Sequence, residues 1–113
     1  MNTEGTKRVC IFCGHRTGKE KVWVDFASNL GNFLGKNKYK LFYGGGSKGI
    51  MGSVALAAKK SGATVHGVIT EKLIETEPIL KNIDEVTVVK TLSKRKEKLI
   101  ENCHVAIVLP GGI

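Results

Sequence analysis

The sequence has little proline and no long apolar run. Only 2 of its 113 residues are proline, against 14 glycines, and 42% are hydrophobic. This composition argues against disordered, collagen-like and low-complexity chains. No apolar stretch approaches the roughly 18 residues of a membrane helix, and no basic-then-apolar leader opens the chain. We therefore expect one globular domain over residues 1–113, located in the cytoplasm and not in a membrane.

Cysteine and histidine are too few, and too irregularly spaced, for a metal site. The three histidines show no ligand spacing, and a single cysteine follows the first predicted strand. Cys10 and Cys13 lie within that strand, whereas a redox Cys-x-x-Cys pair sits where a strand gives way to a helix. We interpret the pair as core packing and expect no metal and no other cofactor.

Acidic residues are outnumbered by basic ones. Eighteen Lys and Arg against ten Asp and Glu give a formal charge of +8, which concentrates anionic ligands such as nucleotides or nucleic acids near the surface. The cations are mostly lysines scattered along the chain without interleaved aromatic residues, a pattern typical of a solvated basic surface. A single-stranded nucleic-acid binder, weakened steeply by salt, is therefore the least supported hypothesis.

Apolar segments alternate between two periodicities along the chain. Nearly continuous apolar runs predict buried strands, and apolar residues at helical spacing predict helices between them. The predicted strands are 8–13, 40–43, 64–69, 85–90 and 104–109, and the predicted helices are 22–34, with Gly35 as its stop, 49–60 and 93–103. Residues 71–84 show no clear pattern beyond room for a short helix. This order predicts an α/β fold, Rossmann-like, with three αβα layers and a parallel sheet.

A glycine-rich loop joins the strand 40–43 to the helix 49–60. Gly44, Gly46 and Gly49 match Gly-x-Gly-x-x-Gly in the strand-to-helix context that phosphate binding needs. Without Cβ atoms the chain can turn sharply and bring N–H groups close to a phosphate, while the helix N-terminus adds partial positive charge. A tight turn without ligand is the alternative. We predict a phosphate cradle at the carboxyl edge of the sheet.

Two other nucleotide sites fit less well. A dinucleotide site places its glycine loop after the first strand, whereas this loop follows the second; Glu71 could imitate the acidic ribose-binding residue, so NAD-type binding stays a minor alternative. The segment from Gly14 to Lys19 is one residue too short for a Walker A loop. Glu20 also stands where Ser or Thr would contact magnesium.

Two further elements point to the same edge of the sheet. Arg95 and Lys96 lie one turn before Leu99 and Ile100, so we expect both cations to point inward at a helix start, where a guanidinium can grip phosphate. A solvated pair of charges without a ligand is the alternative. The last predicted strand runs into Gly111 and Gly112, which predicts a turn into another helix N-terminus. We expect that the sequence is cut here from a longer chain.

Together these segments resemble the LOG ("lonely guy") family, also labelled lysine decarboxylase-like. The likeness spans nearly the whole chain. Tyr43 to Gly52 is similar to the family's YGGGxxGxMG loop, and Arg95-Lys96 to its RK pair. The other matching segments are Val9 to Gly14 (the opening strand), Gly67-Val68-Ile69 (the GVIP strand) and Pro110-Gly111-Gly112 (the first half of PGGxGTxxE).

The resemblance implies a cytokinin riboside 5'-monophosphate phosphoribohydrolase, which hydrolyses the N-glycosidic bond of a nucleoside monophosphate and releases free base and ribose 5-phosphate. It implies a homodimer, with Arg95 as the catalytic arginine and Lys96 beside it. The implied phosphate- and substrate-binding residues are Gly14, Gly44, Gly45, Gly46, Gly49, Met51, Gly111 and Gly112.

The sequence departs from the family pattern in three places. The family's catalytic Glu belongs to GTxxE, which these 113 residues do not contain, so we expect the chain to bind better than it catalyses. His15 stands where the family often has Ser, and Thr70 where it usually has Pro. No Lys has a context that suggests a pyridoxal phosphate Schiff base, so a decarboxylase is not expected. A non-catalytic nucleotide-binding or sensor module remains the alternative.

Overall fold

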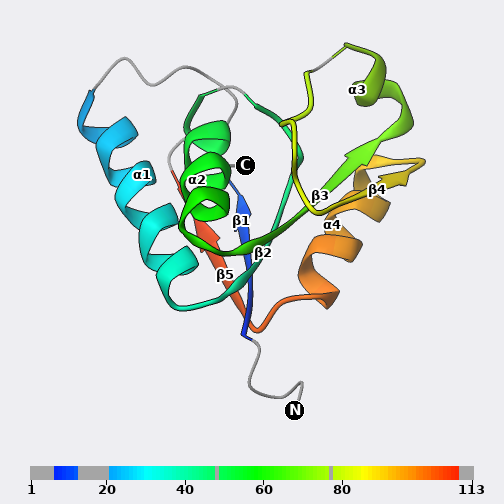
Figure 1. Cartoon of the computed structure of the whole chain (residues 1–113). Coiled ribbons are helices and arrows are strands. Elements are labelled where there is room, and N and C mark those ends of the chain that lie inside the picture. The colour runs from blue at the N-terminus through cyan, green and yellow to red at the C-terminus, as the bar shows by residue number, and fades with distance from the viewer. Residues whose placement is uncertain (1–6, 13–20, 48, 77, 110–113) are drawn as a thin grey trace.

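The computed structural model describes residues 7–12, 21–47, 49–76 and 78–109. Its five strands form one parallel sheet in the order β4-β3-β2-β1-β5 (Figure 1). The strands are β1 (Arg8–Phe12), β2 (Lys40–Tyr43), β3 (Thr64–Thr70), β4 (Glu85–Val89) and β5 (Val105–Val108). All five strands predicted from the sequence are present, which confirms the α/β class.

Helices cover both faces of this sheet. Helices α1 (Lys21–Lys36) and α2 (Gly49–Ser61) pack side by side on one face, and α4 (Leu92–Glu101) lies on the other (Figure 1). The short α3 (Glu71–Thr76) follows β3 at the carboxyl edge. These three layers confirm the Rossmann-like prediction. Within the described ranges no helix is long and apolar enough to cross a membrane.

Alternating residues of the strands build two cores, one on each face. Val9 and Ile11 of β1 join Leu41 of β2 under α1 and α2, whereas Cys10 and Phe42 face α4 and meet its one buried apolar residue, Leu99. Because side chains alternate along a strand, a run without polar interruptions supplies both faces at once. This explains why the central strands read as continuous apolar segments.

The predicted helix stop at Gly35 is wrong. Helix α1 continues to Lys36 and ends when Lys38 takes a left-handed φ of 58°. The Tyr39 N–H then donates to the Leu34 carbonyl at 3.0 Å and the Lys38 N–H to the Gly35 carbonyl at 3.1 Å, the pattern of a Schellman cap. A Cβ on Gly35 would collide with Ser61 at the end of α2. The glycine therefore serves close helix packing.

Asp84 joins three elements just before β4. One carboxylate oxygen accepts the Val65 N–H at 2.7 Å, and the other accepts Lys59 Nζ at 2.8 Å, which ties the end of α2 to the start of β3. The hydrogen bond from Lys59 is the main cause that lowers the pKa of Asp84. The carboxylate therefore stabilises the fold above its unfolded pKa, and this contribution is lost as the pH falls through the lower folded value.

We expect Asp84→Asn to lower the free energy of unfolding by about 1 kcal/mol at pH 7, since a partly exposed charged hydrogen bond is lost. The difference from wild type should shrink as urea unfolding is repeated from pH 7 down to about pH 3. Glu97→Gln is the matched control, because its 3.3 Å ion pair with Lys94 is exposed on both sides and should contribute little. A pH-independent Asp84→Asn effect would contradict the assigned charge interaction.

Candidate phosphate-binding site

The glycine-rich loop leaves β2 at the carboxyl edge of the sheet and leads into α2. Gly45 has a φ of +84° and Gly49 one of +64°, values that favour glycine over residues with a side chain. Gly67 of β3 lies against the loop so closely that a Cβ there would come within 2.9 Å of the Gly45 Cα. The glycines thus serve both the turn and the close approach of the loop to the middle of β3.

Three successive carbonyls of the loop accept hydrogen bonds from three different parts of the chain. The Gly44 carbonyl accepts Arg95 Nη2 at 2.7 Å, and the Gly46 carbonyl accepts the buried Tyr43 hydroxyl at 3.0 Å. The Gly45 carbonyl between them accepts the Leu80 N–H at 3.1 Å. The conformation of the loop is therefore determined by tertiary contacts as well as by its glycines.

Arg95 connects α4 to the ends of two strands. Its Nε donates to the Val68 carbonyl of β3 at 2.9 Å, while Nη2 reaches Gly44. A Cβ on Gly44 would collide with this guanidinium, so one reason for the glycine is room for Arg95. The N-cap Thr91 starts the helix by accepting the Lys94 N–H at 3.1 Å, and so sets the position of Arg95 on its first turn.

The two predicted cations do not lie alike. Arg95 is half-buried and points inward as expected, above the buried Leu99. Lys96 is exposed and follows the outer side of the helix together with Ile100, whose side chain is 58% exposed. The expectation that both cations point inward is therefore wrong for Lys96, because a shift of one residue turns a helical side chain by about 100°.

The remaining predicted site residues divide into two groups. Met51 is half-buried beneath the loop: a Cβ on Gly46 would come within 3.3 Å of its Sδ. Gly49 is the first residue of α2. Gly14, Gly111 and Gly112 lie outside the described residues. Lys48, within the loop, lies outside them as well.

A segment from the weakly patterned stretch 71–84 lies across the loop. Ile79 forms an antiparallel bridge with Gly46, flanked by bonds from the Leu80 N–H to the Gly45 carbonyl and from the Ser47 N–H to the Pro78 carbonyl. We call residues 78–80 the strap. The strap was not predicted from the sequence, because backbone pairing does not depend on the type of side chain. Pro78 was its one signal, since proline has no N–H to donate and pairs only through its carbonyl.

The cysteines and histidine of the described core show no catalytic arrangement. Cys10 is fully buried, and burial, followed by the neighbouring Cys103, raises the pKa of its thiol to about 12. It therefore stays protonated at neutral pH, in agreement with core packing; Cys13 lies outside the described residues. The ring of His66 stacks on that of Phe42, with 4.9 Å between the ring centroids. Burial lowers the pKa of His66. No group of three or more possible metal ligands occurs among the described residues.

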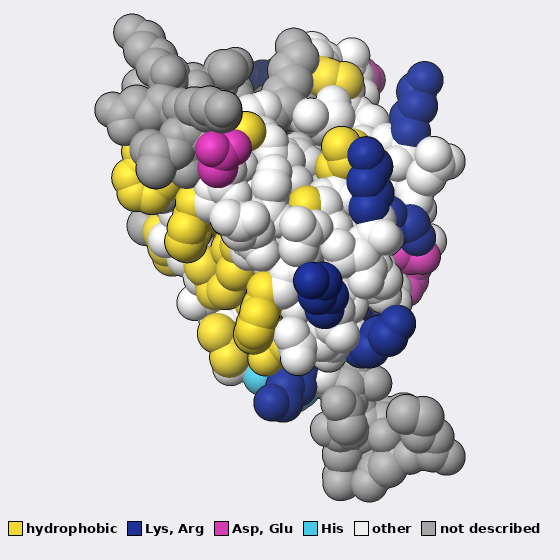
Figure 2. All heavy atoms as spheres, turned by 60° about the vertical axis from the view of Figure 1, so that its left-hand side comes forward, with side chains coloured by type: hydrophobic (Ala, Val, Ile, Leu, Met, Phe, Trp, Pro, Cys, Tyr) yellow, Lys and Arg dark blue, Asp and Glu magenta, His cyan; other side chains and the backbone are white. Residues whose placement is uncertain are grey.

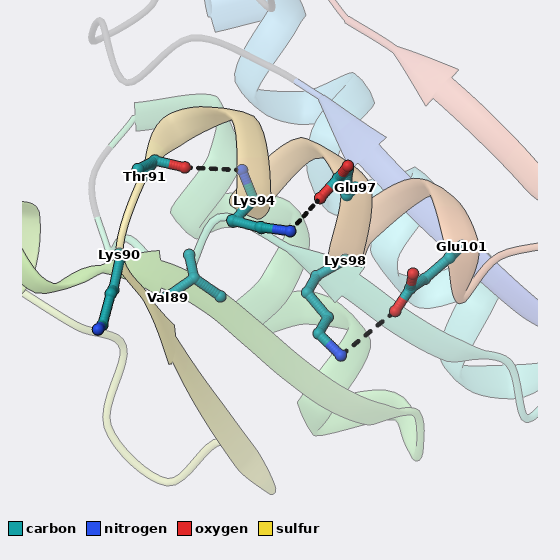
Figure 3. Close-up of a pocket in the computed structure, with 7 residues that line it drawn as sticks. All are labelled: Val89, Lys90, Thr91, Lys94, Glu97, Lys98 and Glu101. Carbon is teal, nitrogen blue, oxygen red and sulfur yellow. Dashed lines mark hydrogen bonds and ion pairs between the residues drawn. The ribbon is translucent and has the colours of Figure 1, made fainter.

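A separate groove of about 550 Å³ lies between the end of β4 and α4 (Figure 3). Its lining residues are Val89, Lys90, Thr91, Lys94, Glu97, Lys98 and Glu101. Lys94 pairs with Glu97 and Lys98 with Glu101, each at 3.3 Å, so carboxylates neutralise much of its positive charge. The groove contains none of the predicted site residues, and the glycine-rich loop remains the candidate site.

Curated relatives share much of the sequence. The chain is 40% identical over 106 residues to "Cytokinin riboside 5'-monophosphate phosphoribohydrolase LOG7" of Arabidopsis thaliana, covering 94% of this chain and 49% of that relative. It is 38% identical over 112 residues to the LOG3 protein of the same plant, covering 99% of this chain and 52% of the relative. The chain therefore spans about half the length of the curated relatives it matches.

Solved structures share the fold at lower identity. A molybdenum cofactor binding protein from Rippkaea orientalis superposes with a TM-score of 0.78 at 18% identity, covering 96% of this chain and 64% of that one. A Moco carrier protein from Chlamydomonas reinhardtii superposes with a TM-score of 0.78 at 20% identity, covering 95% of this chain and 64% of that one. Such identities establish the fold alone.

A family profile matches the sequence directly. The profile described as "Possible lysine decarboxylase" covers residues 51–113, more than half of the chain, including Arg95. The glycine-rich loop lies immediately before and at the start of this range. The chain therefore belongs to the "Possible lysine decarboxylase" family, the LOG family that its glycine-rich loop and Arg-Lys pair resemble.

Proposed function

We propose that the protein is a nucleoside 5'-monophosphate phosphoribohydrolase, which hydrolyses the N-glycosidic bond of AMP or of a cytokinin riboside monophosphate. The observation that carries the proposal is the glycine-rich loop held by Arg95 at the carboxyl edge of the sheet. Parallel α/β sheets bind ligands at this edge. The names of the relatives that are about 40% identical agree with this substrate class.

The loop supplies the phosphate half of such a site. Backbone N–H groups of the loop other than that of Ser47, which binds the Pro78 carbonyl, and those at the start of α2 can bind the 5'-phosphate, helped by the positive end of the helix. Arg95 adds a fixed positive charge beside them and keeps the loop in place. Gly14, Gly111 and Gly112 belong to the same proposed site by resemblance, as does Lys96 at its margin.

The chemistry requires a carboxylate beside the sugar. Water adds to the anomeric carbon, the N-glycosidic bond breaks, and the base leaves with a proton, through an oxocarbenium-like state that a carboxylate stabilises. The resemblance assigns this role to the Glu of GTxxE, which is not among the 113 residues. We accordingly propose that this chain binds the nucleotide better than it hydrolyses it.

The proposal is tested by incubating the protein, expressed from its full reading frame, with AMP and separately with isopentenyladenosine monophosphate. We expect adenine or isopentenyladenine to appear on chromatography, at a rate that falls in Arg95→Ala. Absence of release from both substrates, with Arg95→Ala and wild type indistinguishable, would overturn the enzyme proposal. Tight AMP binding without release would support the non-catalytic nucleotide-binding module instead.

We also propose a homodimer. Large apolar side chains are exposed on α1, where Trp23 is 38%, Phe26 48% and Phe33 55% exposed. Figure 2 shows hydrophobic side chains gathered in a band on the face that includes this helix. Burial of such a surface favours self-association, and light scattering distinguishes a 12.2 kDa monomer from a dimer of twice that mass. Cytoplasmic location stays a prediction.

A further inference from the structure

Tyr43 is the last residue of β2 and immediately precedes the glycine-rich loop. Its side chain is 1% exposed and packs within the core under α1 and α2. From there the hydroxyl donates to the Gly46 carbonyl at 3.0 Å. Because the surrounding core holds the ring, the donor position is set by packing and cannot follow the loop if the loop moves.

The direction of one carbonyl sets the direction of the following amide. In a planar trans peptide unit, the carbonyl of one residue and the N–H of the next point in opposite directions. The bond from Tyr43 to the Gly46 carbonyl therefore directs the Ser47 N–H the other way, where it meets the Pro78 carbonyl of the strap at 3.2 Å. The two bonds hold this peptide from both ends.

The two preceding peptide units are held in the same way. Arg95 holds the Gly44 carbonyl, so the Gly45 N–H points away from the guanidinium. The Leu80 N–H holds the Gly45 carbonyl, so the Gly46 N–H points away from the strap. Each orientation limits how far the neighbouring unit can rotate, and loss of one hydrogen bond loosens the others.

We infer that Tyr43 is a positioning residue of the phosphate cradle: its buried hydroxyl fixes the Gly46–Ser47 peptide and thereby the loop amides that receive a 5'-phosphate. The inference deepens the proposed function and rests on it for the identity of the ligand. Tyr43 acts through the backbone and needs no contact with the nucleotide. The strap is the second part of this device, because it accepts the Ser47 N–H.

Isothermal titration of Tyr43→Phe with AMP and with adenosine tests the inference, because the two ligands differ only in the phosphate. We expect AMP to bind about fivefold to tenfold more weakly than to wild type, the equivalent of one hydrogen bond. The affinity of Tyr43→Phe for adenosine should stay within about twofold of the wild-type affinity. A general loss of structure would weaken both ligands together.

Tyr39→Phe is the matched control. Tyr39 precedes β2 and is half-buried against the same core. The substitution also removes one phenolic hydroxyl group, but at a position far from the loop. We expect it to bind AMP and adenosine as wild type does. Tyr43→Phe with unchanged AMP affinity, or with equal losses for AMP and adenosine, would overturn the inference.

Amide hydrogen exchange provides a second measurement that does not depend on a ligand. In Tyr43→Phe the Ser47 N–H should exchange faster, while the Leu41 N–H within β2 keeps its protection. Equal exchange of Ser47 in both proteins would also overturn the inference. If AMP binds without base release and these differences appear, the proposed hydrolase function fails while the positioning role stands.

Discussion

Arg95→Ala should lower kcat/KM for base release from a nucleoside monophosphate by about 100-fold, the size of effect produced when a reacting group is misplaced by about 1 Å. The guanidinium holds the Gly44 carbonyl at 2.7 Å and the Val68 carbonyl at 2.9 Å, so its removal frees the ends of β2 and β3 at once. The measurement is steady-state release of base from AMP by the protein expressed from its full reading frame.

Arg95→Lys separates charge from geometry. An ammonium group keeps the positive charge but lacks the planar fork that reaches two carbonyls together, so we expect only partial recovery. Lys94→Ala is the control on the same helical turn: its side chain is exposed and pairs with Glu97 on the outer side of α4. Full activity in Arg95→Lys would show that charge alone matters and would contradict the bridging role.

Gly31→Ala should lower the free energy of unfolding by about 2 to 3 kcal/mol, although alanine favours helices more than glycine by about 1 kcal/mol. Gly31 lies where α1 crosses α2. A Cβ there would come within 2.5 Å of the Val54 carbonyl oxygen and 2.7 Å of the Ala57 Cβ. The helices must separate to admit it, which disrupts the packing above β1 and β2.

Urea unfolding of Gly31→Ala and Asn29→Ala measures this effect against a control. Asn29 is exposed on the same helix, so the alanine there meets no neighbour and should change stability by less than about 0.5 kcal/mol. A Gly31→Ala protein as stable as wild type would mean that the α1–α2 contact can open without cost. Total stability for a domain of this size is only about 5 to 15 kcal/mol, so the expected loss is large.

The fold was predictable because its strands and helices have strong local patterns. The apolar runs of β1, β2 and β5 and the spacing in α1 and α2 predicted their type and order, and the alternation of strands and helices predicted the parallel sheet. Helix ends were less predictable. Gly35 looked like a stop, yet its role depends on Ser61 of another helix, which no local pattern contains.

The candidate site was predictable in part. The glycine spacing and its strand-to-helix context located the loop, and the position of Arg95 one turn before Leu99 predicted its inward direction. Lys96 was predicted wrongly, because the sequence does not show which of two adjacent stripes on the helix packs against the sheet. Ile100 looked as buried as Leu99 but is 58% exposed.

By itself, the sequence determined the α/β class, the place of the glycine-rich loop and the resemblance to the LOG family. Only the tertiary structure decided how that loop is held. Its three carbonyl bonds come from Tyr43, from the strap residue Leu80 and from Arg95, which are 3, 35 and 51 positions away from their partners. The bonds from Leu80 and Arg95 join residues that are far apart in the sequence, and the bond from the nearby Tyr43 depends on the core that holds its ring. All three therefore depend on how strands and helices pack, which a local pattern does not encode.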